Sequence, residues 1–145
     1  NRFISMNFMI CRDAFLKVRF DETFHLGYED TLFGMQLEQA GVEILHIDNP
    51  VYHLVEENSE QFLMKIRRAV RNLDGHIEQM HSHVKLLRWY ACVKRLGMAP
   101  LVAFLFRQIE KRLVSNLTSR KPSLKLFAFY KLGYLCNFLS QKKPD

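Results

Sequence analysis

Asn7-Phe8-Met9-Ile10-Cys11-Arg12 opens the stretch that decides the fold, and Phe20-Asp21-Glu22 and Gly27-Tyr28-Glu29-Asp30 continue it. The stretch closes with His46-Ile47-Asp48-Asn49-Pro50-Val51-Tyr52-His53. Two adjacent carboxylates stand at an expected helix start, and a histidine follows an expected short strand. That layout suits a site that activates a hydroxyl group beside a metal-bound phosphate.

Short strand patterns flank a helix pattern in the first half of the chain. Residues 3–10 alternate between two mostly apolar sets, so we expect a strand that is buried on both faces. Its polar exception, Asn7, is either a core amide satisfied by the backbone or a ligand-facing group at a strand end. A helix is expected from about residue 30 to residue 40, stopped by Gly41, and a second strand over residues 42–47.

Helix patterns dominate the second half. Asn58-Ser59-Glu60-Gln61 is a capping-box pattern, and apolar residues then recur at helical spacing as far as Leu73. Further helices are expected around Leu86 to Val93 and from Leu124 to Leu139. The uncharged run from Leu101 to Phe106 is far shorter than the roughly 20 residues that a membrane-spanning helix needs.

The charge of the chain is unevenly distributed. Residues 1–83 carry 8 Lys and Arg against 13 Asp and Glu, a net charge of −5, whereas residues 84–145 carry 13 against 2, a net charge of +11. The 145 residues are the length of one domain or a part of one. Such a division predicts an acidic folded or catalytic part and a basic tail that faces an anionic partner.

Two further features bear on the class of protein. The chain begins at Asn1 and shows no signal-peptide pattern, so we expect a fragment of a longer protein. The three cysteines are widely separated and form no CxxC pair, which argues against a zinc ribbon or a disulfide framework. Reduced thiols in a cytosolic protein are the expectation.

Glu29, Asp30 and His53 are the candidate residues for chemistry. A carboxylate base and a divalent cation together favour attack of a hydroxyl on a group with a diphosphate leaving group. Oxygen and imidazole ligands suit Mn²⁺ or Mg²⁺. The structural alternative is that the acidic pair only stabilises a helix N-terminus and that the histidine only packs.

The order of these motifs resembles the GT-A fold of family 2 glycosyltransferases, and it is similar to the carboxy-terminal galactosyltransferase-type module. The run Glu29-Asp30-Thr31-Leu32-Phe33-Gly34, followed by His46-Ile47-Asp48-Asn49-Pro50-Val51, is close to a bacterial branch that builds surface polysaccharides. The resemblance implies an α/β fold, with the carboxy-terminal part of a GT-A domain (short strands plus helices) over residues 1–75. A basic, mainly α-helical tail follows over residues 76–145.

The resemblance also implies roles for individual residues. Asp30 would be the general base, Glu29 and Tyr28 would bind the acceptor, and His53 would be a ligand of Mn²⁺ or Mg²⁺. Asn7 and Arg12 would line the nucleotide-sugar donor region. The family's nucleotide-binding half and its Asp-x-Asp motif are absent from these residues, so half of an active site is expected.

The expected function is therefore that of a fragment of an inverting glycosyltransferase. It would serve in the transfer of a sugar from a nucleotide-sugar donor to a glycan or lipid-linked acceptor, and it would be inactive alone. It would be cytoplasmic. Its basic tail would either lie at an anionic membrane surface or carry Lys and Arg that only solvate the outer faces of helices packed on the catalytic domain. The alternative is a basic helical module that binds nucleic acid or another partner without catalysis; no recognised nucleic-acid-binding motif supports it.

Overall fold

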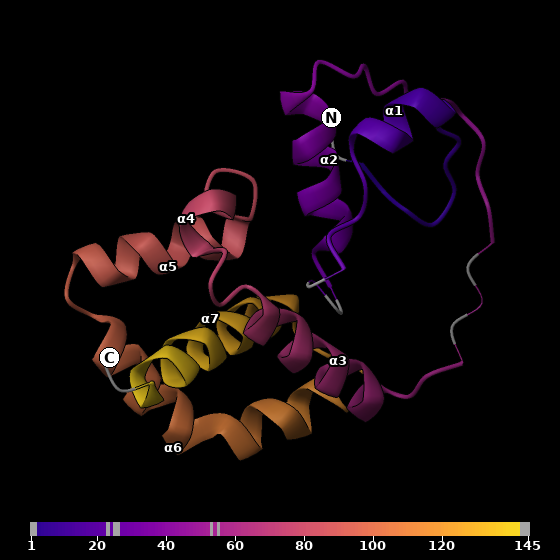
Figure 1. The fold of residues 1–145 in the computed structure, drawn as a ribbon. Coiled ribbons are helices and arrows are strands. Elements are labelled where there is room, and N and C mark those ends of the chain that lie inside the picture. Colours follow the sequence, from indigo (N-terminus) through magenta and orange to yellow (C-terminus); the bar gives the residue numbers. More distant parts are fainter. Residues whose placement is uncertain (1–2, 23, 25–26, 53, 55, 143–145) are drawn as a thin grey trace. The chain divides into compact units, whose positions relative to one another are not determined.

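The structure is a computed structural model that describes residues 3–22, 24, 27–52, 54 and 56–142. The chain divides into two compact units, residues 1–56 and 57–145, which are described separately here (Figure 1). The predicted α/β fold is wrong, because the regular elements of the described residues are all helices and none of these residues lies in a β-strand. The predicted division into domains between residues 75 and 76 stays a prediction.

The first unit is built around one helix. It contains α1 (Arg12–Lys17) and α2 (Glu29–Gln39). Phe33 and Leu37 of α2 are buried against Phe3 and Val18. Phe20 stacks on Phe33 with the ring centroids 4.1 Å apart, and the Phe3 ring meets Phe33 edge-on at 5.2 Å. Aromatic contacts of these two kinds are the preferred geometries for ring pairs, so they specify how the segments pack.

Helix α2 ends as its sequence predicts. Gly41 has a φ of 70°, the left-handed conformation that glycine adopts without steric cost. Its N–H donates to the carbonyl of Glu38, and the N–H of Val42 donates to the carbonyl of Leu37. These bonds satisfy carbonyl groups that the last turn leaves free, so the predicted stop at Gly41 is confirmed.

The two segments predicted as strands are irregular. In residues 3–10 the side chain of Met9 is 98% exposed, which is incompatible with burial on both faces. In residues 42–47 the side chain of Leu45 is 79% exposed. A strand requires a neighbouring strand that accepts and donates a ladder of backbone hydrogen bonds. Alternation of apolar residues shows that a segment can pair, but it does not supply the partner.

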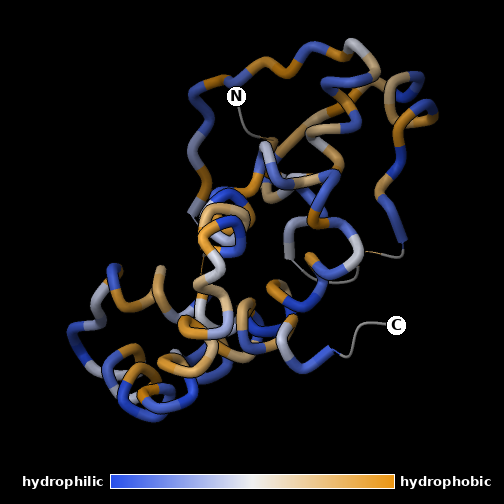
Figure 2. The backbone as a smooth tube through the Cα atoms, turned by 90° about the vertical axis from the view of Figure 1, so that its left-hand side faces the viewer, coloured by the Kyte–Doolittle hydropathy of each residue, from blue (hydrophilic) through white to orange (hydrophobic). Residues whose placement is uncertain are grey.

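The second unit is an assembly of helices. It contains α3 (Ser59–Asn72), α4 (Ile77–Met80), α5 (Lys85–Arg95), α6 (Ala99–Leu117) and α7 (Leu124–Gln141). Helix α7 contacts α3, α5 and α6, and it lies alongside α6 in Figure 1. Figure 2 shows hydrophobic (orange) and hydrophilic (blue) residues intermixed along the chain. The largest fully buried side chains of the unit include Leu73, Met80, Leu87, Phe106, Tyr130 and Leu135.

Two local features of this unit follow from its sequence. The capping box predicted before α3 is confirmed, because Gln61 N–H donates to Asn58 Oδ1 at 2.9 Å and Asn58 N–H donates to Gln61 Oε1 at 3.1 Å. Gly133 of α7 faces Phe106 of α6, and a Cβ at this position would lie 2.6 Å from the Phe106 ring. The absence of a side chain at Gly133 therefore lets α6 and α7 approach closely.

Arginines of α3 lie on tyrosines of α7. Arg67 Nε donates to the Tyr130 hydroxyl at 2.5 Å, and Arg71 Nε donates to the Tyr134 hydroxyl at 2.6 Å. The Arg67 guanidinium also forms an ion pair with Glu110 of α6 at 2.7 Å. Three helices are thus joined by charge-assisted hydrogen bonds at one place.

The membrane-spanning potential of the helices is limited. Among the described residues, no single helix combines the length and the apolar character needed to cross a bilayer. Helices α5 and α6, which meet at a bend of 115°, satisfy the length and composition only when they are taken together.

Candidate functional site

The turn that leads into α2 has an unusual backbone. Gly27 has a φ of 79°, and Tyr28 has a φ of 71°. Tyr28 is the only residue other than glycine with a positive φ among those that the structure describes. A bulky side chain in the left-handed region costs roughly 1–2 kcal/mol, and such strain is concentrated at binding and catalytic sites. The strained backbone makes residues 28–30 a candidate functional site.

Asp30 is held in place by the residue after it. The Thr31 N–H donates to Asp30 Oδ1 at 2.7 Å, and the Thr31 hydroxyl lies 3.4 Å from the same oxygen. The pair is partly buried, and Oδ2 takes no part in either contact. Because one oxygen is anchored, the carboxylate has a defined orientation in the first turn of α2.

Glu29 has a buried oxygen without a partner. Its Oε2 atom is inaccessible to solvent and accepts no hydrogen bond from any described residue. A buried polar atom without a hydrogen bond costs roughly 1–3 kcal/mol, so such atoms are uncommon and need a reason. A hydroxyl of a bound molecule would satisfy this oxygen.

The predicted donor-binding residues lie elsewhere in the first unit. Asn7 Nδ2 donates to the carbonyl of Asn49 at 3.3 Å and so bridges the first segment to the last. Arg12 is the exposed first residue of α1. The structure therefore does not join Asn7, Arg12 and the Glu29–Asp30 pair into one cluster through any contact between described residues.

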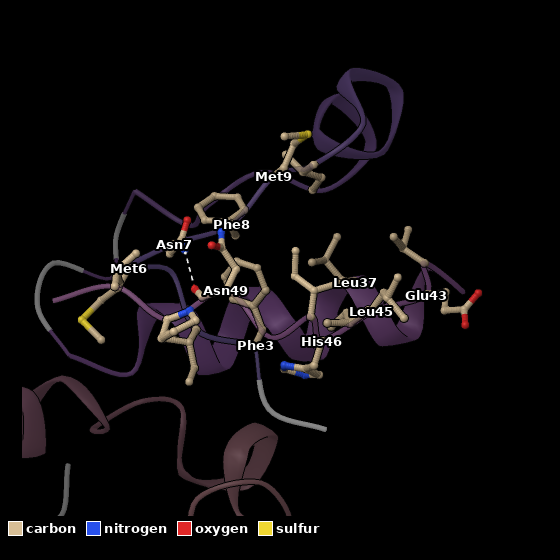
Figure 3. A pocket seen from close by; sticks show the side chains of 17 residues that line it. Phe3, Met6, Asn7, Phe8, Met9, Leu37, Glu43, Leu45, His46 and Asn49 are labelled. Carbon is tan, nitrogen blue, oxygen red and sulfur yellow. Dashed lines mark hydrogen bonds between the residues drawn. The ribbon is translucent and has the colours of Figure 1, made fainter. Parts of the chain in front are cut away.

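An open cavity of about 650 Å³ lies between the two segments that were predicted as strands. Its lining comes from residues 3–10, from Leu37 and from residues 42–51, and Glu29 and Asp30 are not among them. Figure 3 shows the Asn7 side chain directed at Asn49, while Met6 and Glu43 project away at opposite ends. The lining is mostly apolar with a few polar groups, which is typical of a small-molecule site.

Two lining residues were missed by the sequence reasoning. His46 and Asn49 both line this cavity. The alternating pattern of residues 42–47 predicted only that His46 is part of a strand. The available signal was the presence of an imidazole and an amide close together at the end of an apolar segment. Only the position of the first segment, held by the Asn7 hydrogen bond, shows that they border a cavity.

The predicted metal ligand, His53, falls outside the described residues. Within the described part of the chain, no three side chains of His, Cys, Asp or Glu are close enough together to hold a metal ion. The prediction of Mn²⁺ or Mg²⁺ therefore stays a prediction. The cysteines are free, with Cys11 and Cys92 exposed and Cys136 buried.

The chain matches no protein-family model, no curated protein and no solved structure. The resemblance to family 2 glycosyltransferases is therefore wrong as a family assignment. That fold is built on a sheet, whereas the regular elements of the described residues are helices. Short motifs in a suitable order were not sufficient, because acidic pairs at helix starts also occur for purely local electrostatic reasons.

Proposed function

We propose that the turn at residues 28–30 is the acceptor-binding half of a site for sugar transfer. In this proposal Asp30 is the general base, and Glu29 and Tyr28 hold the acceptor sugar. The observation that carries the proposal is the buried Glu29 Oε2, which accepts no hydrogen bond from any described residue and follows directly after the left-handed Tyr28. Two costly features at adjacent positions are explained together if a ligand completes them.

A sugar hydroxyl is the group that suits this arrangement. A carboxylate accepts hydrogen bonds and cannot donate them when it is ionised, so it recognises hydroxyl donors. An aromatic ring such as that of Tyr28 offers an apolar face and a polar hydroxyl, a combination that fits a sugar ring. Glu29 would bind one hydroxyl of the acceptor and thereby place a neighbouring hydroxyl at Asp30.

The reaction would be a single displacement. Asp30 takes the proton of the acceptor hydroxyl while the hydroxyl oxygen forms a bond to the anomeric carbon of a nucleotide sugar. The bond from that carbon to the diphosphate oxygen breaks, and the nucleoside diphosphate leaves with the electron pair. One base on the acceptor side gives inversion at the anomeric carbon.

The donor side is a second, separable part of the proposal. Asn7 and Arg12 would contact the nucleotide sugar, Arg12 as an exposed cation that can pair with phosphate. A divalent cation would neutralise the leaving diphosphate, with His53 as the expected ligand. A glycan or lipid-linked acceptor would then bind at Glu29 and Tyr28.

Acceptor binding can be tested on this chain without a complete reaction. Amide NMR shifts are recorded while a panel of hexoses, N-acetylhexosamines and short oligosaccharides is added. We expect at least one sugar to shift the amides of residues 28–31, and Glu29→Gln to weaken its binding about tenfold or more, because a charged acceptor of a hydrogen bond is lost.

The matched control is Glu38→Gln, which removes the same charge from the exposed far end of α2. It should leave sugar binding unchanged. The proposal is wrong if no sugar perturbs residues 28–31, or if Glu38→Gln and Glu29→Gln have the same effect. With a bound sugar identified, Asp30→Asn should preserve its binding and remove the release of nucleoside diphosphate in a transfer assay.

A further inference from the structure

A group of large apolar side chains is exposed where α5 turns into α6. Trp89, the only tryptophan of the chain, is 53% exposed on α5. We call the group the corner surface; its members are Trp89, Leu96, Met98, Leu101, Phe104 and Leu105. Six large exposed apolar residues within one stretch of 17 residues make this part of the chain a candidate interaction surface.

The exposed apolar residues stand on both sides of the bend between the two helices. Gly97, with a φ of 68°, ends α5, and the axes of α5 and α6 meet at 115°. Leu101, Phe104 and Leu105 are spaced i, i+3 and i+4 on α6, so they lie on one face. Each is exposed, whereas Val102, Ala103 and Phe106 on the opposite face of the helix are buried in the unit. The exposed face is therefore not the core face of α6.

Exposed cations lie on the same two helices as the corner surface. Four exposed basic residues lie on α5 and three on the exposed face of α6: Lys85, Arg88, Lys94, Arg95, Arg107, Lys111 and Arg112. Residues 79–109 contain no Asp or Glu. The next acid, Glu110, is paired with Arg67 at 2.7 Å. The two helices that carry the apolar group thus hold seven exposed cations, in a stretch of sequence that has no Asp or Glu from residue 79 to residue 109.

This combination fits the surface of an anionic bilayer better than it fits other anionic partners. Nucleic acid would be bound by the cations but would leave the leucines exposed. A lipid surface accepts both, since apolar side chains enter the boundary with the acyl chains while Lys and Arg remain at the head groups. Tryptophan is enriched at that boundary because its ring is apolar and its N–H is polar.

We propose that the corner surface binds anionic membranes by shallow insertion of Trp89, Leu96, Leu101 and Phe104, with the basic residues of α5 and α6 at the lipid head groups. The proposal concerns the second unit alone and does not depend on sugar transfer at Asp30. Insertion is shallow because each helix lies along the boundary and neither crosses it, in keeping with the lengths of α5 and α6.

Trp89 makes the test direct, because the fluorescence of this chain reports on one tryptophan. The complete chain is mixed with vesicles of phosphatidylcholine alone or of phosphatidylcholine with phosphatidylglycerol. We expect binding and a blue shift of the Trp89 emission only with phosphatidylglycerol. Lipids brominated on the acyl chains should quench the emission, since the ring enters the apolar boundary.

Two double variants separate the apolar and basic contributions. Leu101→Ser with Phe104→Ser should reduce partitioning roughly tenfold for each side chain removed. Lys94→Gln with Arg95→Gln should reduce it about fivefold for each charge, the effect of one cation near an anionic surface. All four residues are exposed, so circular dichroism should show an unchanged helix content.

Matched controls lie beyond the far end of α6. Arg120→Gln with Lys121→Gln removes the same charge, and Leu124→Ser removes a leucine that is 81% exposed, more than Leu101 is. They stand about 28 Å along the helix from the corner, well beyond the roughly 8 Å screening length at physiological salt. These variants should partition like the unaltered chain.

Three outcomes would overturn the proposal. One is the absence of binding to phosphatidylglycerol vesicles. Another is binding without a blue shift or quenching of Trp89, which would mean adsorption by charge alone. The third is an equal loss of vesicle binding in the corner variants and in the control variants. Tight binding of RNA or DNA that needs Lys94 and Arg95 but not Leu101 and Phe104 would instead identify a nucleic-acid surface.

Discussion

Arg67 of α3 donates a hydrogen bond from Nε to the hydroxyl of Tyr130 on α7, a residue 63 positions later in the chain, at 2.5 Å. The guanidinium carbon lies 5.7 Å from the centroid of the same ring. Partial burial disfavours the charge of Arg67, but the bond to Tyr130 and the nearby Glu110 outweigh it, so the pKa of Arg67 is raised. Burial also raises the pKa of Tyr130, which therefore remains a hydroxyl donor and acceptor at neutral pH.

The first prediction concerns this pair. Tyr130→Phe should lower the free energy of unfolding by about 1–2 kcal/mol, because a bond to a charged group is lost while the ring is kept. In a double-mutant cycle with Arg67→Met, measured by urea denaturation, the coupling energy should be about 1 kcal/mol. Arg68→Met, at an exposed position of the same helix, should change stability by less than about 0.5 kcal/mol. A coupling energy of zero would contradict the role given to the pair.

The second prediction concerns the close approach of α6 and α7. Gly133→Ala places a Cβ within 2.6–2.9 Å of three Phe106 atoms, so the helices must move apart. We expect the free energy of unfolding to fall by about 1–2 kcal/mol, because overpacking costs roughly 1–3 kcal/mol. The better helix propensity of alanine offsets only part of this cost. In a Phe106→Leu background, Gly133→Ala should lower the free energy of unfolding by less. A rise in the midpoint of thermal unfolding for Gly133→Ala alone would contradict this packing.

The third prediction concerns thiol reactivity. Burial raises the pKa of the Cys136 thiol to about 11, whereas Cys11 and Cys92 are exposed. The thiolate is the reactive form, so Cys136 is protected both by its protonation and by its burial. A chromogenic disulfide reagent at neutral pH should label two of the three cysteines in the folded chain. The third should react only after denaturation, and its rapid labelling in the native chain would show that α7 is not packed as described.

The fourth prediction concerns alkaline pH. The pKa of the Cys136 thiol, 9.0 in its ordinary state, is about 11 in the folded chain. Burial likewise raises the pKa of Tyr90 and of Tyr130. Because folding favours the protonated forms, the contribution of the Cys136 thiol to stability is complete below pH 9 and is lost as the pH rises toward 11. The contributions of Tyr90 and Tyr130 are complete below their ordinary pKa of 10.0 and are lost above it. The midpoint of urea denaturation should fall over that range, and Cys136→Ala should make the fall less steep.

Some features of the candidate site could be predicted from the sequence, and others could not. An acidic pair at the start of α2 was predictable, because Gly27 before it and Gly41 after it bound an apolar helical pattern. The left-handed conformation of Tyr28 could not be predicted, and neither could the buried Glu29 oxygen that accepts no hydrogen bond from a described residue. Both depend on how the chain packs around them. His46 was missed for a similar reason, since it lines a cavity between segments far apart in the chain.

By itself the sequence determined the local features of this protein. The capping box at Asn58, the helix stop at Gly41 and the helical runs of the basic half depend on residues within a few positions of one another, where propensity and hydrogen bonding decide. Tertiary structure decided whether the alternating segments 3–10 and 42–47 become strands, because a strand exists only beside a partner. It also decided which apolar residues stay exposed at the corner of α5 and α6, since burial depends on which helices cover each face.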